Sequence, residues 1–274
     1  MTELLAHAKL NLALVVGERR ADGLHEVATV LQRLELADRL TLEPGDRLAV
    51  EGFPEDTLVR DALTRLAEAA RVEPRWRVRI EKGIPVAAGL GGGSADAGAV
   101  LAAANAGLPR PLAAADLNAL AGRIGADVPF FLARGPQLAE GAGERLTALD
   151  LPQEYHVVVA LAHGAEKRST AGVYGRFDEL GGGPGFTERR GRLRAALAAA
   201  RSPRELAALP PNDLAPAAGS SPLLDDLRAA GALRADVSGA GPAVFGLFET
   251  AEEAESAALA LDARADVWVT RPVW

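Results

Sequence analysis

A glycine-rich segment in the first half of the chain has the composition of a phosphate-binding loop. Residues 85–97 read PVAAGLGGGSADA, after an alternating strand pattern and before an Ala-rich helical pattern. Consecutive glycines let the backbone approach an anion closely, and the free amides and dipole at the start of a helix attract negative charge. Ser94 could donate to a phosphate oxygen or help to hold Mg²⁺. The alternative is a flexible loop capped by Ser94, but the strand-then-helix context favours phosphate binding.

This segment carries no cation of its own. It lacks a Gly-Lys-Ser/Thr sequence, so it is not a Walker A loop, and it does not follow the first strand as a dinucleotide-binding loop would. The positive charge must therefore come from elsewhere. Lys82 is close in sequence and Lys9 could come close in space, although a single lysine is more often a solvated surface group.

A second candidate is the carboxylate of Asp127, within residues 125–131 (GADVPFF). Asp127 precedes a predicted short helix, so its simplest role is an N-cap, which Pro129 in the first turn supports. A carboxylate beside a phosphate loop could instead accept the proton of a substrate hydroxyl. Such general-base help accelerates a reaction by about 10²–10⁴-fold.

A third candidate is the small-residue loop within residues 236–245 (DVSGAGPAVF). It can be a simple hairpin turn between two strands. In the functional interpretation, Ser238, Gly239 and Gly241 form a second backbone wall that closes over the phosphates.

Bulk composition narrows the class of protein. The 274 residues suit two modest domains or one large one, and 49% are hydrophobic although only 4% are aromatic. The net charge of −7 argues against a general nucleic-acid binder, and the lack of cysteine excludes disulfides, thiolate metal sites and cysteine nucleophiles. The N-terminal apolar run is interrupted by Lys9 and Asn11 and is too short to span a membrane. We expect a cytoplasmic enzyme with a small-molecule substrate and no nucleic-acid or membrane partner; the oligomeric state is not predicted.

Hydrophobic periodicity predicts strands alternating with helices in both halves of the chain, and hence two α+β domains, 1–150 and 151–274. Residues 165–168 (AEKR) are expected to form a charged, exposed stretch and residues 181–185 a flexible connection. Strands are expected at 10–16, 76–80, 157–161, 243–248 and 267–269, a hairpin at 39–50 with its turn at 44–46, and helices at 58–70, about 95–106, 116–124, 127–131, 189–201, 223–230 and 250–261.

Three of these segments resemble, in order, the three short motifs of the GHMP kinases, which include galactokinase, homoserine kinase and mevalonate kinase. They are residues 8–12 (AKLNL), the segment 85–96 and the loop 238–245, so the resemblance covers nearly the whole chain. It implies a two-domain GHMP kinase-like fold, with an N-terminal ribosomal-protein-S5-like domain and a C-terminal ferredoxin-like domain. ATP and Mg²⁺ are the implied cofactors.

Four features resemble one branch of that family. They are residues 8–12 followed by 20–26 (RADGLHE), three successive glycines at 91–93 where most relatives have Gly-Ser-Ser, the segment 125–131, and residues 141–144 (GAGE). The resemblance implies phosphorylation by ATP of the 2-hydroxyl of a cytidine-diphosphate-linked methylerythritol in the non-mevalonate isoprenoid pathway.

The same resemblance implies roles for individual residues. Asp127 takes the general-base position, with Lys9 beside it to orient the hydroxyl and steady the carboxylate as an anion. Asn11 and His25 meet the substrate, His25 at the cytosine, and Tyr174 stacks on that base. Ser94 would hold the metal. The implied nucleotide-binding set is Lys82, Pro85, Val86, Ala87, Ala88, Gly89, Leu90, Gly91, Gly92, Gly93, Ser94, Ala95 and Asp96.

The sequence departs from the pattern of the family at four positions. Leu24, placed at the substrate, stands where an aromatic residue is usual, and stacking of a base on an aromatic ring contributes about 1–3 kcal/mol. A weaker or less selective cytidine pocket is therefore expected. Thr57 replaces a common Asn near the adenine, His7 a common Pro, and Ala95 a second Ser. These differences predict changed binding, not loss of chemistry.

Two other functions remain open at this point. One is a GHMP kinase for another small alcohol such as homoserine, against which the His25 segment and the triple glycine argue. The other is a catalytically silent sensor that only binds nucleotide and sugar, against which the intact Lys9 and Asp127 argue.

Overall fold

The computed structural model describes residues 1–165 and 169–274, so most of the expected charged stretch lies outside the described residues. The chain forms two compact units. The first contains Met1–Ala8, Leu36–Val86 and Gly91–Arg134, and the second contains Lys9–Glu35, Ala87–Leu90 and Gly135–Trp274. They are interleaved because the long strands β1 (Thr2–Arg19) and β2 (His25–Pro44) contribute to both. The compact units therefore differ from a single division near residue 150.

The first unit contains a sheet in which β4 (Trp76–Glu81) is central. Residues 39–44 of β2 pair antiparallel with β4, and β3 (Ala49–Glu51) pairs parallel with β4 on its other side. The expected hairpin at 39–50 is therefore wrong. The amide of Gly45 donates to the carbonyl of Arg75 (3.0 Å), which holds the chain at the start of β4 instead of reversing it onto β2.

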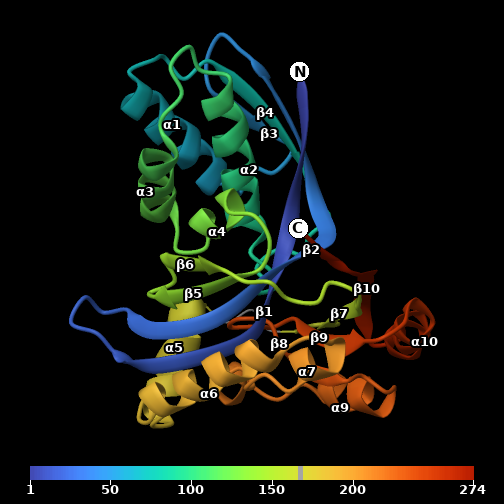
Figure 1. Ribbon diagram of the computed structural model, residues 1–274. Coiled ribbons are helices and arrows are strands. Elements are labelled where there is room, and N and C mark those ends of the chain that lie inside the picture. Colours follow the sequence, from blue (N-terminus) through green and yellow to red (C-terminus); the bar gives the residue numbers. More distant parts are fainter. Residues whose placement is uncertain (166–168) are drawn as a thin grey trace. The chain divides into compact units, whose positions relative to one another are not determined.

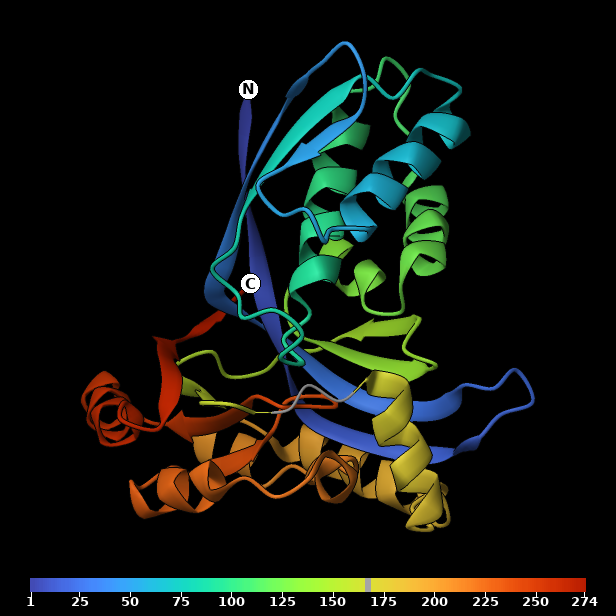
Figure 2. The ribbon, with the colours of Figure 1, turned by 180° about the vertical axis from the view of Figure 1, so that it is seen from behind.

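Helices cover one face of this sheet (Figures 1 and 2). They are α1 (Leu58–Ala70), α2 (Gly92–Ala106), α3 (Ala114–Ile124) and α4 (Val128–Leu132). The expected bounds of α1 are confirmed, whereas α2 begins three residues earlier than expected. Strand β4 alternates buried and exposed residues, as predicted for a strand with one wet face. The shared core includes Leu40, Leu42, Val59, Leu63, Leu66, Val78, Ile80, Val100 and Leu101.

The second unit contains a four-stranded antiparallel sheet in the order β10-β7-β9-β8. Its strands are β7 (His156–Ala162), β8 (Arg234–Val237), β9 (Val244–Phe248) and β10 (Ala265–Thr270). Helices α9 (Pro222–Ala229) and α10 (Ala251–Leu261) pack on it through Leu227, Ala254 and Leu261. The chain order strand–helix–strand–strand–helix–strand is the expected ferredoxin-like arrangement.

The remaining part of the second unit is built on the inner portions of β1 and β2. Residues 27–31 of β2 pair with β5 (Gln137–Gly141), which pairs with β6 (Arg145–Ala148), and β11 (Pro272–Val273) also joins β2. Helices α5 (Thr170–Glu179) and α8 (Ala215–Ala218) pack on β1 and β2 through Leu14, Val16, Phe177 and Leu214. Helices α6 (Phe186–Ala199) and α7 (Pro203–Ala207) complete the unit. Within the described ranges, no helix is both long and apolar enough to cross a membrane.

Candidate active site

The start of α2 presents the glycine-rich segment as a helix N-terminus. Gly91 occupies the N-cap position with a φ of 72°, in the left-handed region that favours glycine, and Gly92 begins the helix. Ser94 lies inside the first turn and does not cap it, so the alternative in which Ser94 is the helix cap is wrong. The backbone amides of this first turn have no partner within the helix and suit an anion.

Residues 87–90 lie in the second unit, against the loop 238–241, which we call the closing loop. The hydroxyl of Ser238 donates to the carbonyl of Gly89 (3.0 Å), and the amide of Ala243 donates to the carbonyl of Ala88 (3.1 Å). A Cβ on Gly89 would lie 2.3 Å from the carbonyl oxygen of Ser238, and the φ of Gly89 is 85°. Only glycine allows these two backbones to approach so closely.

Lys9 and Asn11 lie beside the closing loop. The Lys9 ammonium donates to Oδ1 of Asn11 (2.7 Å), and Nδ2 of Asn11 donates to the hydroxyl of Thr29 (2.8 Å). A Cβ on Gly239 would lie 3.1 Å from Asn11 Oδ1 and 3.4 Å from Lys9 Nζ. Lys9 is only 5% exposed, so it is not the solvated surface lysine of the simpler interpretation. The second unit thus brings Lys9, Asn11, Gly89 and the closing loop together.

The closing loop is also a hairpin turn, because it joins the antiparallel strands β8 and β9. The amide of Ser238 donates to Ala243 O (3.0 Å), and the amide of Gly241 donates to Ser238 O (2.9 Å). The φ values of Gly239 and Gly241 are 57° and 70°. The loop therefore has the geometry of a hairpin turn. Its proximity to Gly89 and Lys9 is also compatible with a role in closing over phosphates.

Asp127 stands at the N-cap position of α4, but its side chain makes no capping hydrogen bond. Pro129 occupies the first turn, as expected. A Cβ on Gly125 would lie 3.9 Å from Oγ of Ser94, so the Asp127 segment and the first turn of α2 are neighbours within the first unit. Lys9 belongs to the other unit, and its pairing with Asp127 remains a prediction.

Lys82 forms a buried cluster with Asp38 and Asp96 in the first unit. Its ammonium donates to both carboxylates, at 2.9 Å to Asp96, while Oδ1 of Asp38 accepts from the amides of Gly83 and Ile84 (2.7 and 2.8 Å). Burial alone lowers the pKa of Lys82, but the two carboxylates outweigh it and the pKa is raised. Lys82 is thus not a solvated lysine. The cluster fixes the strand end before the glycine segment to the start of α2.

The pKa of Asp96 in this cluster is raised from its ordinary value. Burial, and then the charge of Asp38, raise the pKa of Asp96 to about 7, against the opposing effect of Lys82. The resemblance to the family places Asp96 at the nucleotide, which remains a prediction. In the structure its Oδ2 accepts from Lys82, and the residue directly follows the first turn of α2.

His25 and Tyr174 come together in the second unit, with ring centroids 4.8 Å apart, and their contact with cytosine remains a prediction. Nε2 of His25 lies 2.8 Å from Oδ1 of Asp178, and Phe177 packs edge-on to the imidazole at 6.2 Å. Leu24, in the turn before β2, is 54% exposed.

Sequence reasoning missed four of these residues: Thr29, Asp38, Phe177 and Asp178. The helical spacing of Tyr174, Phe177 and Asp178 on α5 (i, i+3, i+4) is a signal that could have placed them on one face. Asp38 and Thr29 lie inside a long strand and carry no comparable local signal.

Comparison with known proteins places this geometry in a family. Two family models match the chain, GHMP kinases N terminal domain over residues 57–135 and GHMP kinases C terminal over residues 218–266. A 4-diphosphocytidyl-2-C-methyl-D-erythritol kinase of Anaeromyxobacter dehalogenans (strain 2CP-C) is 42% identical, over 95% of this chain and 85% of that protein. The protein of that name from Nocardia farcinica (strain IFM 10152) is 40% identical, over 93% of this chain and 88% of its own.

Solved structures give the same result for the fold. The crystal structure of a 4-(cytidine 5'-diphospho)-2C-methyl-D-erythritol kinase matches with a TM-score of 0.82 and 36% identity, covering 100% of both chains. A homoserine kinase from Cytophaga hutchinsonii matches with a TM-score of 0.75 at 20% identity, covering 98% of this chain and 93% of its own. The expected two-domain α+β fold is confirmed.

Proposed function

Because the chain belongs to the GHMP kinase family, we propose that it transfers the γ-phosphoryl group of ATP to the 2-hydroxyl of 4-diphosphocytidyl-2-C-methyl-D-erythritol. Relatives of that name are about 40% identical over most of the chain. The observation that carries the proposal is the His25–Tyr174 pair, which supplies an imidazole and an aromatic ring for a pyrimidine. It lies in the same compact unit as Lys9, Asn11 and the closing loop.

In this proposal Asp127 takes the proton of the 2-hydroxyl as its oxygen attacks the γ-phosphorus, and the bond to the bridging oxygen of ADP breaks. Phosphoryl transfer depends mainly on alignment and neutralisation of charge. The Lys9 ammonium supplies a buried positive charge beside Gly239, where the lack of a side chain leaves the backbone open to an anion. The first-turn amides of α2 supply further donors.

Mg²⁺ and ATP fit the residues present at the start of α2. Ser94 offers a hydroxyl oxygen in the first turn, and Mg²⁺ prefers oxygen ligands completed by water and substrate phosphates. We propose that Ser94 is the residue of this segment that holds the metal. Bound there, Mg²⁺ would neutralise charge on the phosphates.

The cytosine would be recognised by the ring of His25. When Nε2–H donates to Asp178, the other nitrogen, Nδ1, is left as an acceptor. An acceptor suits the exocyclic amino group of cytosine and not the carbonyl that uracil carries there. Tyr174 offers one stacking face, while Leu24 replaces the second ring that the family usually has.

The test compares acceptors with the full chain, ATP and Mg²⁺. We expect phosphate transfer to 4-diphosphocytidyl-2-C-methyl-D-erythritol and no measurable transfer to homoserine or mevalonate. Asp127→Asn should lose most turnover while retaining ATP binding. Preferential turnover of homoserine would contradict the proposed substrate, and binding of ATP without any transfer would favour a sensor.

A further inference from the structure

We propose that Asn212, held by the buried Asp236–Arg234 ion pair, is a positioning residue that sets the direction of the backbone amides in the closing loop. This proposal rests on the proposed function only because it takes the ligand of the closing loop to be a nucleoside polyphosphate. Asn212 lies between α7 and α8, far from the closing loop in sequence, and none of the family motifs above includes it.

Asn212 holds two carbonyls at the end of β8. Its Nδ2 donates to Val237 O (2.9 Å) and to Gly239 O (2.6 Å), and its Oδ1 accepts from the amide of Leu214 (2.9 Å). The side chain is 2% exposed. Both polar atoms of this amide group are therefore used, and its nitrogen donates to the last residue of β8, Val237, and to Gly239 in the closing loop.

The planar geometry of the peptide unit means that a hydrogen bond to a carbonyl also fixes the direction of the next residue's N–H. In a trans peptide the N–H points opposite to the C=O of the same unit. Fixing Gly239 O on Asn212 therefore turns the amide of Ala240 away from Asn212. Within the described chain, the amides of Gly239 and Ala240 donate no hydrogen bond, so both remain available to an anion. Lys9 Nζ approaches the same glycine, 3.4 Å from where its Cβ would be.

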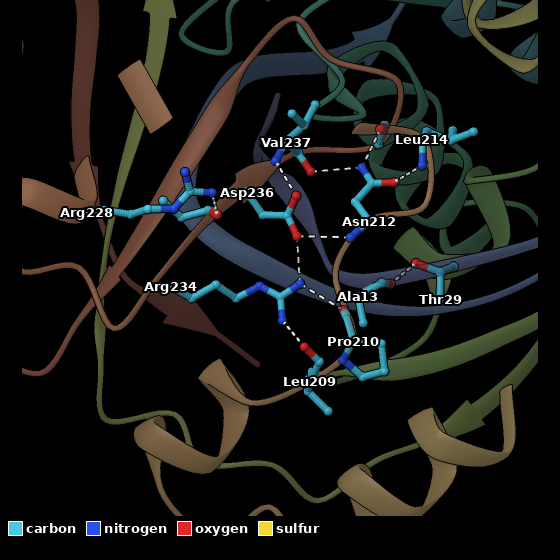
Figure 3. Close-up of polar contacts among 12 residues, drawn as sticks. Ala13, Thr29, Leu209, Pro210, Asn212, Leu214, Arg228, Arg234, Asp236 and Val237 are labelled. Atoms are coloured by element: carbon cyan, nitrogen blue, oxygen red, sulfur yellow. Dashed lines mark hydrogen bonds and ion pairs between the residues drawn. The ribbon is translucent and has the colours of Figure 1, made fainter. Parts of the chain in front are cut away.

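The ion pair fixes Asn212 in turn (Figure 3). Oδ2 of Asp236 accepts from the backbone amide of Asn212 (3.0 Å) and from Arg234 (2.7 Å). Arg234 also donates to the carbonyls of Leu209 and Pro210 (2.5 and 2.9 Å). Arg234 and Asp236 are 8% and 6% exposed, so neither charge is screened by bulk water.

A second contact of Asp236 links the pair to the loop directly. Its Oδ1 accepts from the amide of Val237 (2.8 Å), the residue before the closing loop. The segment that carries Asn212 is also pinned to β1, since the amide of Asp213 donates to Leu14 O (2.8 Å). The segment that carries Asn212 thus has an anchor on β1 that does not involve the loop, as a template for the loop requires.

The experiment compares Asn212→Ala with Asn105→Ala. Asn105 is a buried asparagine in the first unit (7% exposed) that exchanges hydrogen bonds with the backbone of Leu112, so both variants lose a buried amide of similar kind. Unfolding temperature, kcat, KM and the affinities for ATP and adenosine are measured for each. Adenosine lacks phosphates, and its binding needs no acceptor substrate.

We expect both variants to lose comparable stability. Only Asn212→Ala should lower kcat, by about 10- to 100-fold, as misplacement of phosphate-facing donors does, and it should weaken ATP binding while leaving adenosine binding unchanged. Arg234→Lys, which keeps the charge but not both carbonyl contacts, should lower kcat in the same direction by less. Equal kcat values in the two asparagine variants, or equal losses for ATP and adenosine, would overturn the proposal.

If Asn212→Ala fails to fold, Arg234→Lys and Asp236→Asn carry the same comparison, and unchanged ATP binding in both would overturn it. Failure of the wild type to phosphorylate the cytidine-linked acceptor would contradict the proposed function instead. The ATP-against-adenosine comparison remains decisive for Asn212 in that case.

Discussion

Asp178 holds the imidazole of His25 through a contact of 2.8 Å between Oδ1 and Nε2, from a helix that also presents Tyr174 to the same ring. The contact selects which imidazole nitrogen carries the proton. Because His25 is buried and Asp178 is partly exposed, the carboxylate forms the outer side of this pair. The start of β2 and the end of α5 thereby orient the imidazole nitrogen that the proposed cytosine contact requires as an acceptor.

The first prediction concerns this pair. Asp178→Leu should raise the KM for the cytidine-linked substrate by about five- to tenfold, the effect of losing one hydrogen bond of about 1 kcal/mol, with little change in kcat. Asp178→Asn retains an acceptor oxygen and should recover most of the affinity. Glu179→Leu on the same helix, whose partner is the exposed Arg176, serves as the control. Equal KM values for Asp178→Leu and Glu179→Leu would contradict the assigned role.

The second prediction concerns Leu24. Leu24→Tyr should strengthen binding of the cytidine-linked substrate, because stacking on an aromatic ring contributes about 1–3 kcal/mol. Steady-state kinetics with limiting substrate measure the effect, which should appear as a KM lower by about tenfold. Cytidine diphosphate as a competing ligand should gain affinity in parallel. An unchanged KM would mean that residue 24 does not face the base.

The third prediction concerns the backbone at Gly239. Gly239→Ala places a Cβ 3.1 Å from Asn11 Oδ1 and 3.4 Å from Lys9 Nζ at a φ of 57°, so it should both destabilise the protein and lower kcat. The left-handed backbone alone costs about 1 kcal/mol for a residue with a Cβ. Gly181→Ala is the matched control, since its φ is 71° and nothing lies within 4 Å of its Cβ position.

Both glycine variants should therefore lose similar free energy of unfolding in denaturant titrations, while only Gly239→Ala loses turnover. A turnover loss in Gly181→Ala of the same size would show that the effect is one of stability and not of crowding at Lys9.

The fourth prediction is a pH dependence of stability that arises from Asp96. Its pKa is raised from 3.8 to about 7, mainly by burial, so the folded state holds this proton more tightly than the unfolded chain. The stabilising contribution is complete below about pH 4 and is lost as the pH rises through about 7. The free energy of unfolding of the wild type should fall across this interval.

Asp96→Asn should flatten that fall, because the amide cannot ionise and can still accept from Lys82. Urea titrations at several pH values across the interval measure it. Asp225→Asn, at an exposed carboxylate paired with Arg228, should keep the wild-type profile. If the free energy of unfolding of Asp96→Asn falls with pH as steeply as that of the wild type, the raised pKa assigned to Asp96 is contradicted.

Local sequence patterns predicted the helices and strands whose bounds depend on neighbouring residues in the chain. The spacing of apolar residues predicted the helix Leu58–Ala70. The alternation of apolar and polar residues predicted that the strand Trp76–Glu81 has one face exposed to solvent. The hairpin at 39–50 was wrong because the turn residues are compatible with two pairings, and the contact of Gly45 with Arg75 selects the other one. The early start of α2 was missed because glycine is a poor helix former, and anchoring by the Lys82 cluster overrides that propensity.

In the candidate site, too, some residues could be predicted from the sequence and others could not. Lys9, Asn11, His25 and Gly239 lie in contiguous motifs and could be chosen from the sequence. Their partners could not, since Thr29, Asp178 and Asn212 are single polar residues whose roles depend on contacts across β1, α5 and the segment before α8. The family resemblance implies that Lys82 lies near the nucleotide, which remains a prediction, whereas its pairing with the two carboxylates of Asp38 and Asp96 had no signal in the sequence.

The central claim is tested most directly by identifying the product that the purified protein makes from ATP and 4-diphosphocytidyl-2-C-methyl-D-erythritol. Phosphorus NMR should detect one new phosphomonoester on the 2-oxygen, formed with an equal amount of ADP and absent with Asp127→Asn. ADP formed without that phosphomonoester, or a phosphate on any other hydroxyl, would contradict the account.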